Sequence, residues 1–149
     1  MAISNYLDER LVSFLEVENR SEALRLLVDK LVEVGKIRDR AAFYEAILGR
    51  EKIVSTGIGM GVAIPHAKLE GYEDFFIVIG IQKKRGIDWN AIDGSLVRLI
   101  FMIGGPENKQ TEYLKILSRL TMVIKEEERR KKLLQATSPQ EVIDIFKDC

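Results

Sequence analysis

Two long apolar runs constrain the fold of this 149-residue chain more than any other feature. They read FFIVIGI (residues 75–81) and LVRLIFMIG (residues 96–104), and turn-forming residues bound each of them. Their length and their content of β-branched residues favour strands that are buried within a sheet. A buried sheet has to be covered by other elements, so the rest of the chain is expected to supply helices.

Segments with helical periodicity lie on either side of these runs. Asn19, followed by Glu22 three residues later, is typical of a helix start, and Gly35 stops the apolar stripe that follows. A second helix is expected to start at Asp39 and to end at Gly49. The two predicted helices therefore precede the two predicted strands in the chain.

The rest of the chain completes the same pattern. A helix is predicted over residues 111–125, a charged helix contains residues 126–132, and a last helix begins at Ser138. A first strand is predicted within residues 9–17. Helices that bracket a central sheet form an α/β layered domain, and the length is that of one compact domain over residues 1–149.

Composition and charge exclude several classes of function. The 23 Lys and Arg residues balance the 23 Asp and Glu residues, so the chain lacks the basic excess that nucleic-acid binding requires. No apolar run is long enough to span a bilayer, so direct membrane insertion is not expected. The first residues do not resemble a signal peptide, and the single cysteine, Cys149, cannot form an internal disulfide. A cytoplasmic location is the simplest expectation.

The segment STGIGMGVAIPHAKL, residues 55–69, is the first candidate for a functional site. Its glycines, Gly57, Gly59 and Gly61, follow neither the dinucleotide-binding pattern nor the P-loop pattern. A tight turn or a bulged strand, in which glycine permits positive φ, is the commoner interpretation of such a segment. The alternative is a loop whose backbone N–H groups approach an anion closely, because no side chain shields them.

His66 follows Pro65 in this segment and is the only histidine of the chain. A lone histidine is commonly a hydrogen-bonded structural residue, but the stiff proline and the irregular glycine-rich backbone favour a functional one. The chain has no nucleophile elbow for a triad, and one His and one Cys cannot make a zinc site, so no metal or cofactor is expected. If His66 takes part in chemistry, we expect the imidazole to be the nucleophile and a phosphoryl to be the group that it carries.

Several segments together resemble one protein family. REKIVSTGIGMGVAIPHAKL, residues 50–69, is similar to the active-site signature of the phosphotransferase-system enzyme IIA domains of the fructose/mannitol type, which include a nitrogen-regulatory branch. DWNAIDGSLVRLIFMIGGP, EYLKILSRLTMVI and SPQEVIDIF resemble later parts of the same family. The resemblance implies an α/β sandwich with a mixed central sheet flanked by helices.

The resemblance also implies the roles of individual residues. His66 would accept a phosphoryl group from the phosphohistidine of the carrier HPr or of a nitrogen-branch homologue. Arg50 would be a cation near the phosphoryl group. The turn of Thr56, Gly57, Gly59 and Gly61 would be the loop that contacts the anion.

One position departs from the family. The helix after the second block usually contributes a second histidine to the site, whereas this chain has Glu112, Tyr113 and Leu114 there. Tyr113 keeps a hydrogen-bond donor but carries no positive charge at pH 7. Because Tyr113 also lies on the apolar stripe of its predicted helix, it is equally well explained as a core residue.

Three functions are compatible with these features. A phosphocarrier would pass the phosphoryl group from His66 to an enzyme IIB component of a sugar permease. A regulatory module would use its phosphorylation state to change its binding to a transporter, a kinase or another enzyme. A degenerate domain would bind a partner without being phosphorylated, which the intact Pro65–His66 pair argues against. We expect a phosphocarrier, and the sequence leaves open whether it serves sugar transport or regulation.

Overall fold

A six-stranded mixed sheet lies at the centre of the structure, a computed structural model that describes residues 1–149. The strand order is β1-β5-β6-β3-β2, and β4 also pairs with β6. The strands are β1 (Val12–Leu15), β2 (Gly57–Gly59), β3 (Val62–Ala63), β4 (His66–Leu69), β5 (Phe76–Gln82) and β6 (Leu99–Pro106). β5 and β6 are antiparallel, whereas β3 and β4 both run parallel to β6. The two apolar runs are thus the central strands, as predicted, and the sheet is mixed.

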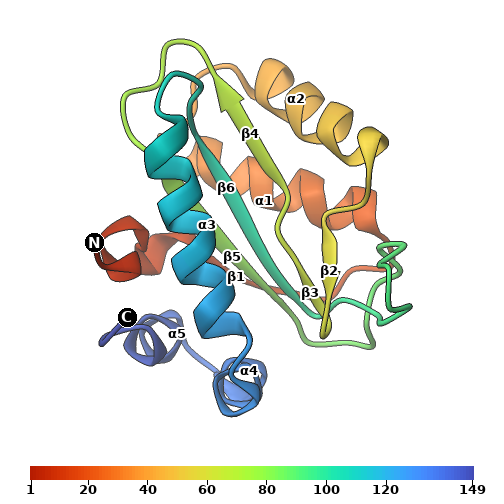
Figure 1. Ribbon diagram of the computed structural model, residues 1–149. Coiled ribbons are helices and arrows are strands. Elements are labelled where there is room, and N and C mark those ends of the chain that lie inside the picture. The colour runs from red at the N-terminus through yellow and green to blue at the C-terminus, as the bar shows by residue number, and fades with distance from the viewer.

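Helices cover both faces of this sheet (Figure 1). The helices α1 (Arg20–Val34) and α2 (Arg40–Ile53) pack on one face. On the other face lie α3 (Gln110–Ile124), α4 (Glu127–Gln135) and α5 (Pro139–Ile145). Two short 3-10 turns, η1 (Ile3–Tyr6) and η2 (Glu9–Leu11), precede β1. The structure contains no helix that could span a membrane.

Alternation along the central strands divides the core into two halves. In β5, Ile77, Ile79 and Ile81 pack toward α3, α4 and α5, whereas Phe76 and Val78 pack toward α1 and α2. Every residue of β5 and β6 is buried because successive side chains enter one half or the other. This burial explains why residues 75–81 and 99–104 are apolar without interruption.

Capping residues set several of the helix ends. The Asn19 side chain accepts a hydrogen bond from the Glu22 N–H at 2.9 Å, and Gly35 ends α1 in the left-handed region at φ 82°. The predicted end of α2 at Gly49 is wrong, because the helix continues to Ile53. Gly49 has helical rather than left-handed backbone, so it lowers helix propensity, by about 1 kcal/mol, without stopping the helix. The extra turn carries Arg50, so its existence shapes the candidate site.

Three short strands, β2, β3 and β4, form the glycine-rich segment. β2 and β3 make an antiparallel hairpin whose register shifts between Gly57 and Gly59, which agrees with the interpretation as a tight turn and bulged strand. Met60 and Gly61 turn the hairpin with φ values of 60° and 76°. β3 and β4 then follow β6 one after the other, which brings His66 beside Ile103, midway along β6.

Candidate functional site

His66 and Arg50 meet where β4 begins and α2 ends. His66 is the first residue of β4, and Arg50 lies in the last turn of α2, which packs on that strand. The Arg50 Nε donates a hydrogen bond to His66 Nε2 at 3.2 Å, and its Nη1 donates to the carbonyl of Val54 at 2.8 Å. The Val54 carbonyl fixes the guanidinium, and the guanidinium in turn satisfies this carbonyl at the end of α2. The structure therefore brings together the two side chains to which the family resemblance gives the main roles.

Hydrogen bonds assign the tautomer of His66. Its Nδ1 lies 3.1 Å from the carbonyl oxygen of Ile64, which can only accept, so Nδ1 carries the proton. Nε2 then has the free lone pair, which agrees with its accepting a hydrogen bond from Arg50. Burial lowers the pKa of His66 below its usual value, and the positive charges of Arg50 and Lys68 lower it further, against the bond to Ile64 and the charge of Glu51. The ring is therefore neutral and nucleophilic at pH 7.

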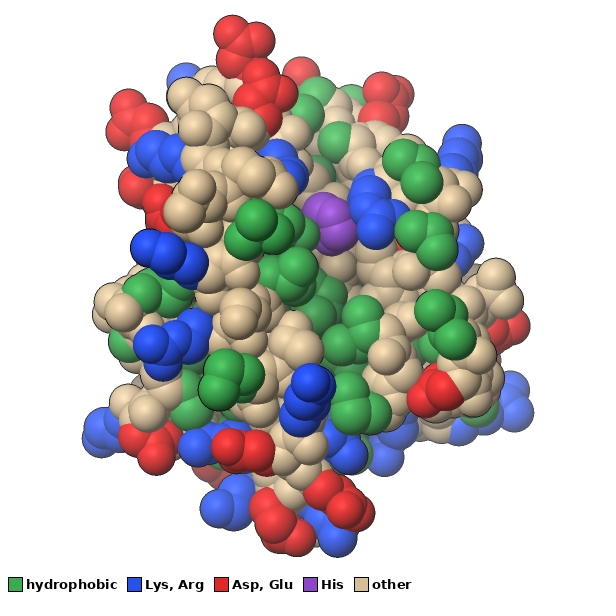
Figure 2. All heavy atoms as spheres, viewed as in Figure 1, with side chains coloured by type: hydrophobic (Ala, Val, Ile, Leu, Met, Phe, Trp, Pro, Cys, Tyr) green, Lys and Arg blue, Asp and Glu red, His purple; other side chains and the backbone are tan.

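A pocket of about 340 Å³ opens in front of His66. It is lined by Arg50, Ser55, Thr56, Ile58, Met60, Ile64, His66, Tyr113, Leu117, Thr121 and Lys125. In Figure 2 the histidine lies in a hollow beside a basic side chain and between apolar ones. No acidic side chain lines the pocket, so it suits an anion. A larger hollow, about 690 Å³, lies beside Met1 and the start of α3, but it contains neither His66 nor an arginine.

Exposed apolar side chains surround the pocket. Ile58 and Met60, which alternate with the glycines of the hairpin, line it and are still about two-fifths exposed. Ile53 and Val54 follow Arg50 at the end of α2 and are more exposed still. Exposed apolar residues gathered round a polar centre are typical of a surface that docks another protein. Sequence reasoning missed Ile58 and Met60, although their alternation with the glycines marks one face of a strand.

The structure places the three glycines against a neighbouring loop and not in the lining of the pocket. The Gly57 N–H donates to Ser55 Oγ at 3.0 Å, and the Gly61 N–H donates to Ser95 Oγ at 3.1 Å. A Cβ on Gly59, whose φ is 95°, would lie 2.8 Å from a carboxylate oxygen of Asp93. Packing against the loop of residues 88–96 thus requires glycine here, and a role in contacting an anion stays a prediction.

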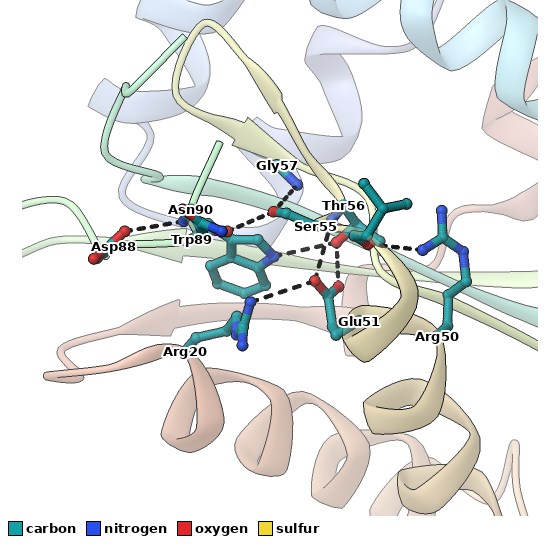
Figure 3. A network of polar contacts seen from close by, with 10 residues as sticks. Arg20, Arg50, Glu51, Ser55, Thr56, Gly57, Asp88, Trp89 and Asn90 are labelled. Atoms are coloured by element: carbon teal, nitrogen blue, oxygen red, sulfur yellow. Dashed lines mark hydrogen bonds and ion pairs between the residues drawn. The ribbon is translucent and has the colours of Figure 1, made fainter. Parts of the chain in front are cut away.

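Thr56 does line the pocket, but its polar atoms belong to a network beneath it (Figure 3). Its N–H donates to Glu51 Oε1 at 3.1 Å, its hydroxyl donates to the other carboxylate oxygen, and it accepts from Trp89 Nε1 at 3.1 Å. Arg20 Nη1 lies 3.8 Å from the same carboxylate. The network joins the last turn of α2 to the start of β2 and so supports Arg50 from below.

Tyr113 lies beside His66 and is also a core residue. The two ring centroids are 5.5 Å apart, and Tyr113 packs against Phe75 in the half of the core under α3. Burial raises the pKa of its phenol, so the ring is neutral at pH 7. No protein group hydrogen-bonds the phenol oxygen. Both interpretations of Tyr113 from the sequence are therefore compatible with its position.

The fold is that of the enzyme IIA class of phosphotransferase-system proteins. The chain belongs to the family described as "Phosphoenolpyruvate-dependent sugar phosphotransferase system, EIIA 2", which matches residues 5–149. Its structure is similar to that of "Nitrogen Regulatory Protein IIA-Ntr" from Neisseria meningitidis, with a TM-score of 0.88 and 29% identity, covering 97% of this chain and 98% of that one. The resemblance seen in the motifs is thus confirmed.

Similar sequences include proteins of both branches. The chain is 41% identical to the "PTS system fructose-specific EIIABC component" of Bacillus subtilis over 89% of its own length, and it spans about a fifth (21%) of that relative. It is 34% identical to the "Nitrogen regulatory protein" of Bradyrhizobium diazoefficiens, with 93% of this chain and 89% of that one covered. The fold also matches enzyme IIA mannitol of Escherichia coli, solved in complex with phosphorylated enzyme IIB mannitol, at a TM-score of 0.80 and 21% identity, covering 96% of this chain and 98% of that one.

Proposed function

We propose that this chain is a phosphocarrier that holds a phosphoryl group on Nε2 of His66. The observation that carries the proposal is the pair of hydrogen bonds on the ring: Nδ1 donates to Ile64, and the lone pair of Nε2 faces Arg50. A phosphoryl group on Nε2 would bring about 1.5 to 2 negative charges next to a guanidinium. Arg50 would then donate to a phosphoryl oxygen, in a charge-assisted hydrogen bond, instead of to His66 Nε2.

The donor in this proposal is the phosphohistidine of an HPr-type carrier. The P–N bond of the donor breaks as the bond between phosphorus and Nε2 forms, and the donor imidazole leaves with the electron pair. The donor ring, protonated on its other nitrogen, leaves as a neutral imidazole, and phosphorylated His66 is an imidazolium that keeps its Nδ1 proton in the hydrogen bond to the Ile64 carbonyl. The exchange joins two imidazoles of similar chemistry, so it needs positioning and charge compensation more than bond activation. An exchange fed by phosphoenolpyruvate belongs in the cytoplasm.

The onward acceptor in this proposal is an enzyme IIB component. The Escherichia coli enzyme IIA with a similar fold was solved with phosphorylated enzyme IIB, which supports such a partner. The exposed apolar side chains round the pocket, Ile53, Val54, Ile58 and Met60, supply a surface for docking. The fructose-specific relative favours transport of a sugar.

A regulatory function is the second candidate, and Tyr113 favours it. The family's second histidine is replaced by a ring that is neutral at pH 7, so one positive charge that would assist rapid exchange is missing. A phosphorylated state that persists suits a module whose state is read by a transporter or another enzyme. The relative named as a nitrogen regulatory protein is in keeping with this alternative.

Intact mass spectrometry after incubation with phosphoenolpyruvate, enzyme I and HPr tests the proposal. We expect one added phosphoryl group that is lost in acid, as a phosphoramidate is, and we expect none on the His66→Ala variant. A phosphorylated alanine variant, or an acid-resistant adduct, would contradict the assignment. Addition of an enzyme IIB protein then separates the two candidates, since only a transport component should lose its phosphoryl group to IIB within seconds to minutes.

A further inference from the structure

Lys68 lies two residues after His66 on β4, and the proposed phosphoryl transfer gives it no role. Residues two apart on a strand share a face, so Lys68 and His66 both point toward α3. The Lys68 Nζ lies 4.2 Å from the centroid of the Tyr113 ring, and it donates a hydrogen bond to Gln110 Oε1 at 2.5 Å. The ammonium is therefore held over the aromatic ring that stands where the family has a histidine.

The phosphoryl site proposed above is short of side-chain donors close to the imidazole. A phosphoryl group has three strong acceptor oxygens and carries about −1.5 to −2 at pH 7, whereas Arg50 already gives its Nη1 to the Val54 carbonyl and the phenol of Tyr113 supplies no charge. Lys125 lines the pocket from the C-terminal end of α3, about three turns beyond Tyr113. Lys68 is close enough to His66 for its charge to lower the pKa of the imidazole, together with burial and Arg50. A lysine side chain has a flexible four-carbon stem and three donors, so its ammonium can turn from Gln110 toward a new anion.

We propose that Lys68 is the second cation of the phosphoryl site, and that the face of Tyr113 holds its ammonium in place for that role. Rather than replacing the missing histidine through its hydroxyl, Tyr113 acts through its ring, which attracts a cation. When the phosphoryl group arrives on Nε2, Lys68 turns from Gln110 and joins Arg50 in contacting its oxygens. This inference rests on the proposed function, since it assigns a further phosphoryl-contacting residue to the same site.

Phosphoramidate, a small phosphoryl donor, tests this proposal without a protein partner. Its P–N bond breaks as the bond to Nε2 forms, and ammonia leaves with the electron pair, so docking surfaces do not enter the rate. We expect Lys68→Gln to slow phosphorylation of His66 by about tenfold to a hundredfold, the range for one charge-assisted hydrogen bond. Lys68→Arg should keep most of the rate. Lys52→Gln, which removes an equal charge from an exposed position two residues after Arg50, should leave the rate unchanged.

Two variants of Tyr113 separate the ring from the hydroxyl. Tyr113→Phe keeps the face on which Lys68 rests, so its rate should match that of the wild type within about twofold. Tyr113→Leu keeps an apolar, though smaller, side chain and removes the face, and it should lose much of the rate that Lys68→Gln loses. Equal phosphorylation rates for the phenylalanine and leucine variants would show that the Tyr113 ring does not hold Lys68 in place.

A titration of unphosphorylated His66 by NMR gives an independent readout. Loss of the Lys68 charge should raise the pKa of His66 in Lys68→Gln and leave it unchanged in Lys52→Gln. A wild-type rate in Lys68→Gln, with His66 still phosphorylated, would overturn this inference and leave the proposed function intact. A wild-type chain that takes no phosphoryl group from either phosphoramidate or HPr would overturn the proposed function, and this inference with it.

Discussion

Replacing Glu51 with glutamine should destabilise the fold through the network under the pocket. The carboxylate side chain is only 2% exposed, and both of its oxygens accept hydrogen bonds from Thr56. Glutamine keeps the volume and one acceptor oxygen, but it places an NH₂ group opposite the Thr56 hydroxyl. That hydroxyl already accepts from Trp89 Nε1, so it can accept from the amide as well, but its own proton then has no acceptor.

The size of the destabilisation follows from the acceptor that the Thr56 hydroxyl loses. A buried donor without an acceptor costs about 1–3 kcal/mol. The lost ion pair with Arg20 adds little, because the Arg20 side chain is 38% exposed and the separation is 3.8 Å. For a chain of about this size, 1 kcal/mol corresponds to a shift in Tm of roughly 2–4 °C. We therefore expect Glu51→Gln to lower Tm by about 3–10 °C.

Thermal and urea unfolding, followed by circular dichroism and by the fluorescence of Trp89, measure the effect. Trp89 is the only tryptophan and donates to Thr56, so its emission reports on the network itself. Glu45→Gln is the matched control, since Glu45 is exposed on the same helix and should change stability by less than about 0.5 kcal/mol. Equal midpoints for the two variants would refute the argument that this carboxylate stabilises the fold.

Three further predictions concern the site. Arg50→Ala should slow phosphorylation of His66 by roughly tenfold to a thousandfold, as expected for loss of one electrostatic donor, and a normal rate would remove Arg50 from the site. Because folding lowers the pKa of His66, the unfolded chain binds more protons, so the free energy of unfolding should fall as pH drops below about 6.5; a His66→Gln variant with the same pH dependence would contradict this. Gly59→Val should lower Tm by several degrees, because a side chain there would meet Asp93 at φ 95°, and an unchanged midpoint would argue against that packing.

Those parts of the fold that depend on local physics were predictable from the sequence. Asn19 and Gly35 end α1 where expected, because a side-chain cap and a left-handed glycine act within one turn of the chain. The apolar runs became β5 and β6 because seven or eight consecutive buried residues fit few other elements. Short strands escaped prediction, since β3 has two residues and owes its pairing to β6 rather than to its own composition.

The sequence by itself therefore determined the layers of the fold and drew attention to His66, but the tertiary structure decided how that residue can act. Arg50 reaches Nε2 only because α2 continues past Gly49 and packs on β4, and the tautomer depends on where the Ile64 carbonyl lies. Likewise, Lys68 meets Tyr113 only because α3 packs on the face of the sheet toward which Lys68 points. These contacts join residues 16 to 45 positions apart, or depend on backbone bent by a turn. Local sequence patterns extend over one or two turns of helix, so they carry no information on such pairs. The packing of the helices on the sheet decides which of these residues meet.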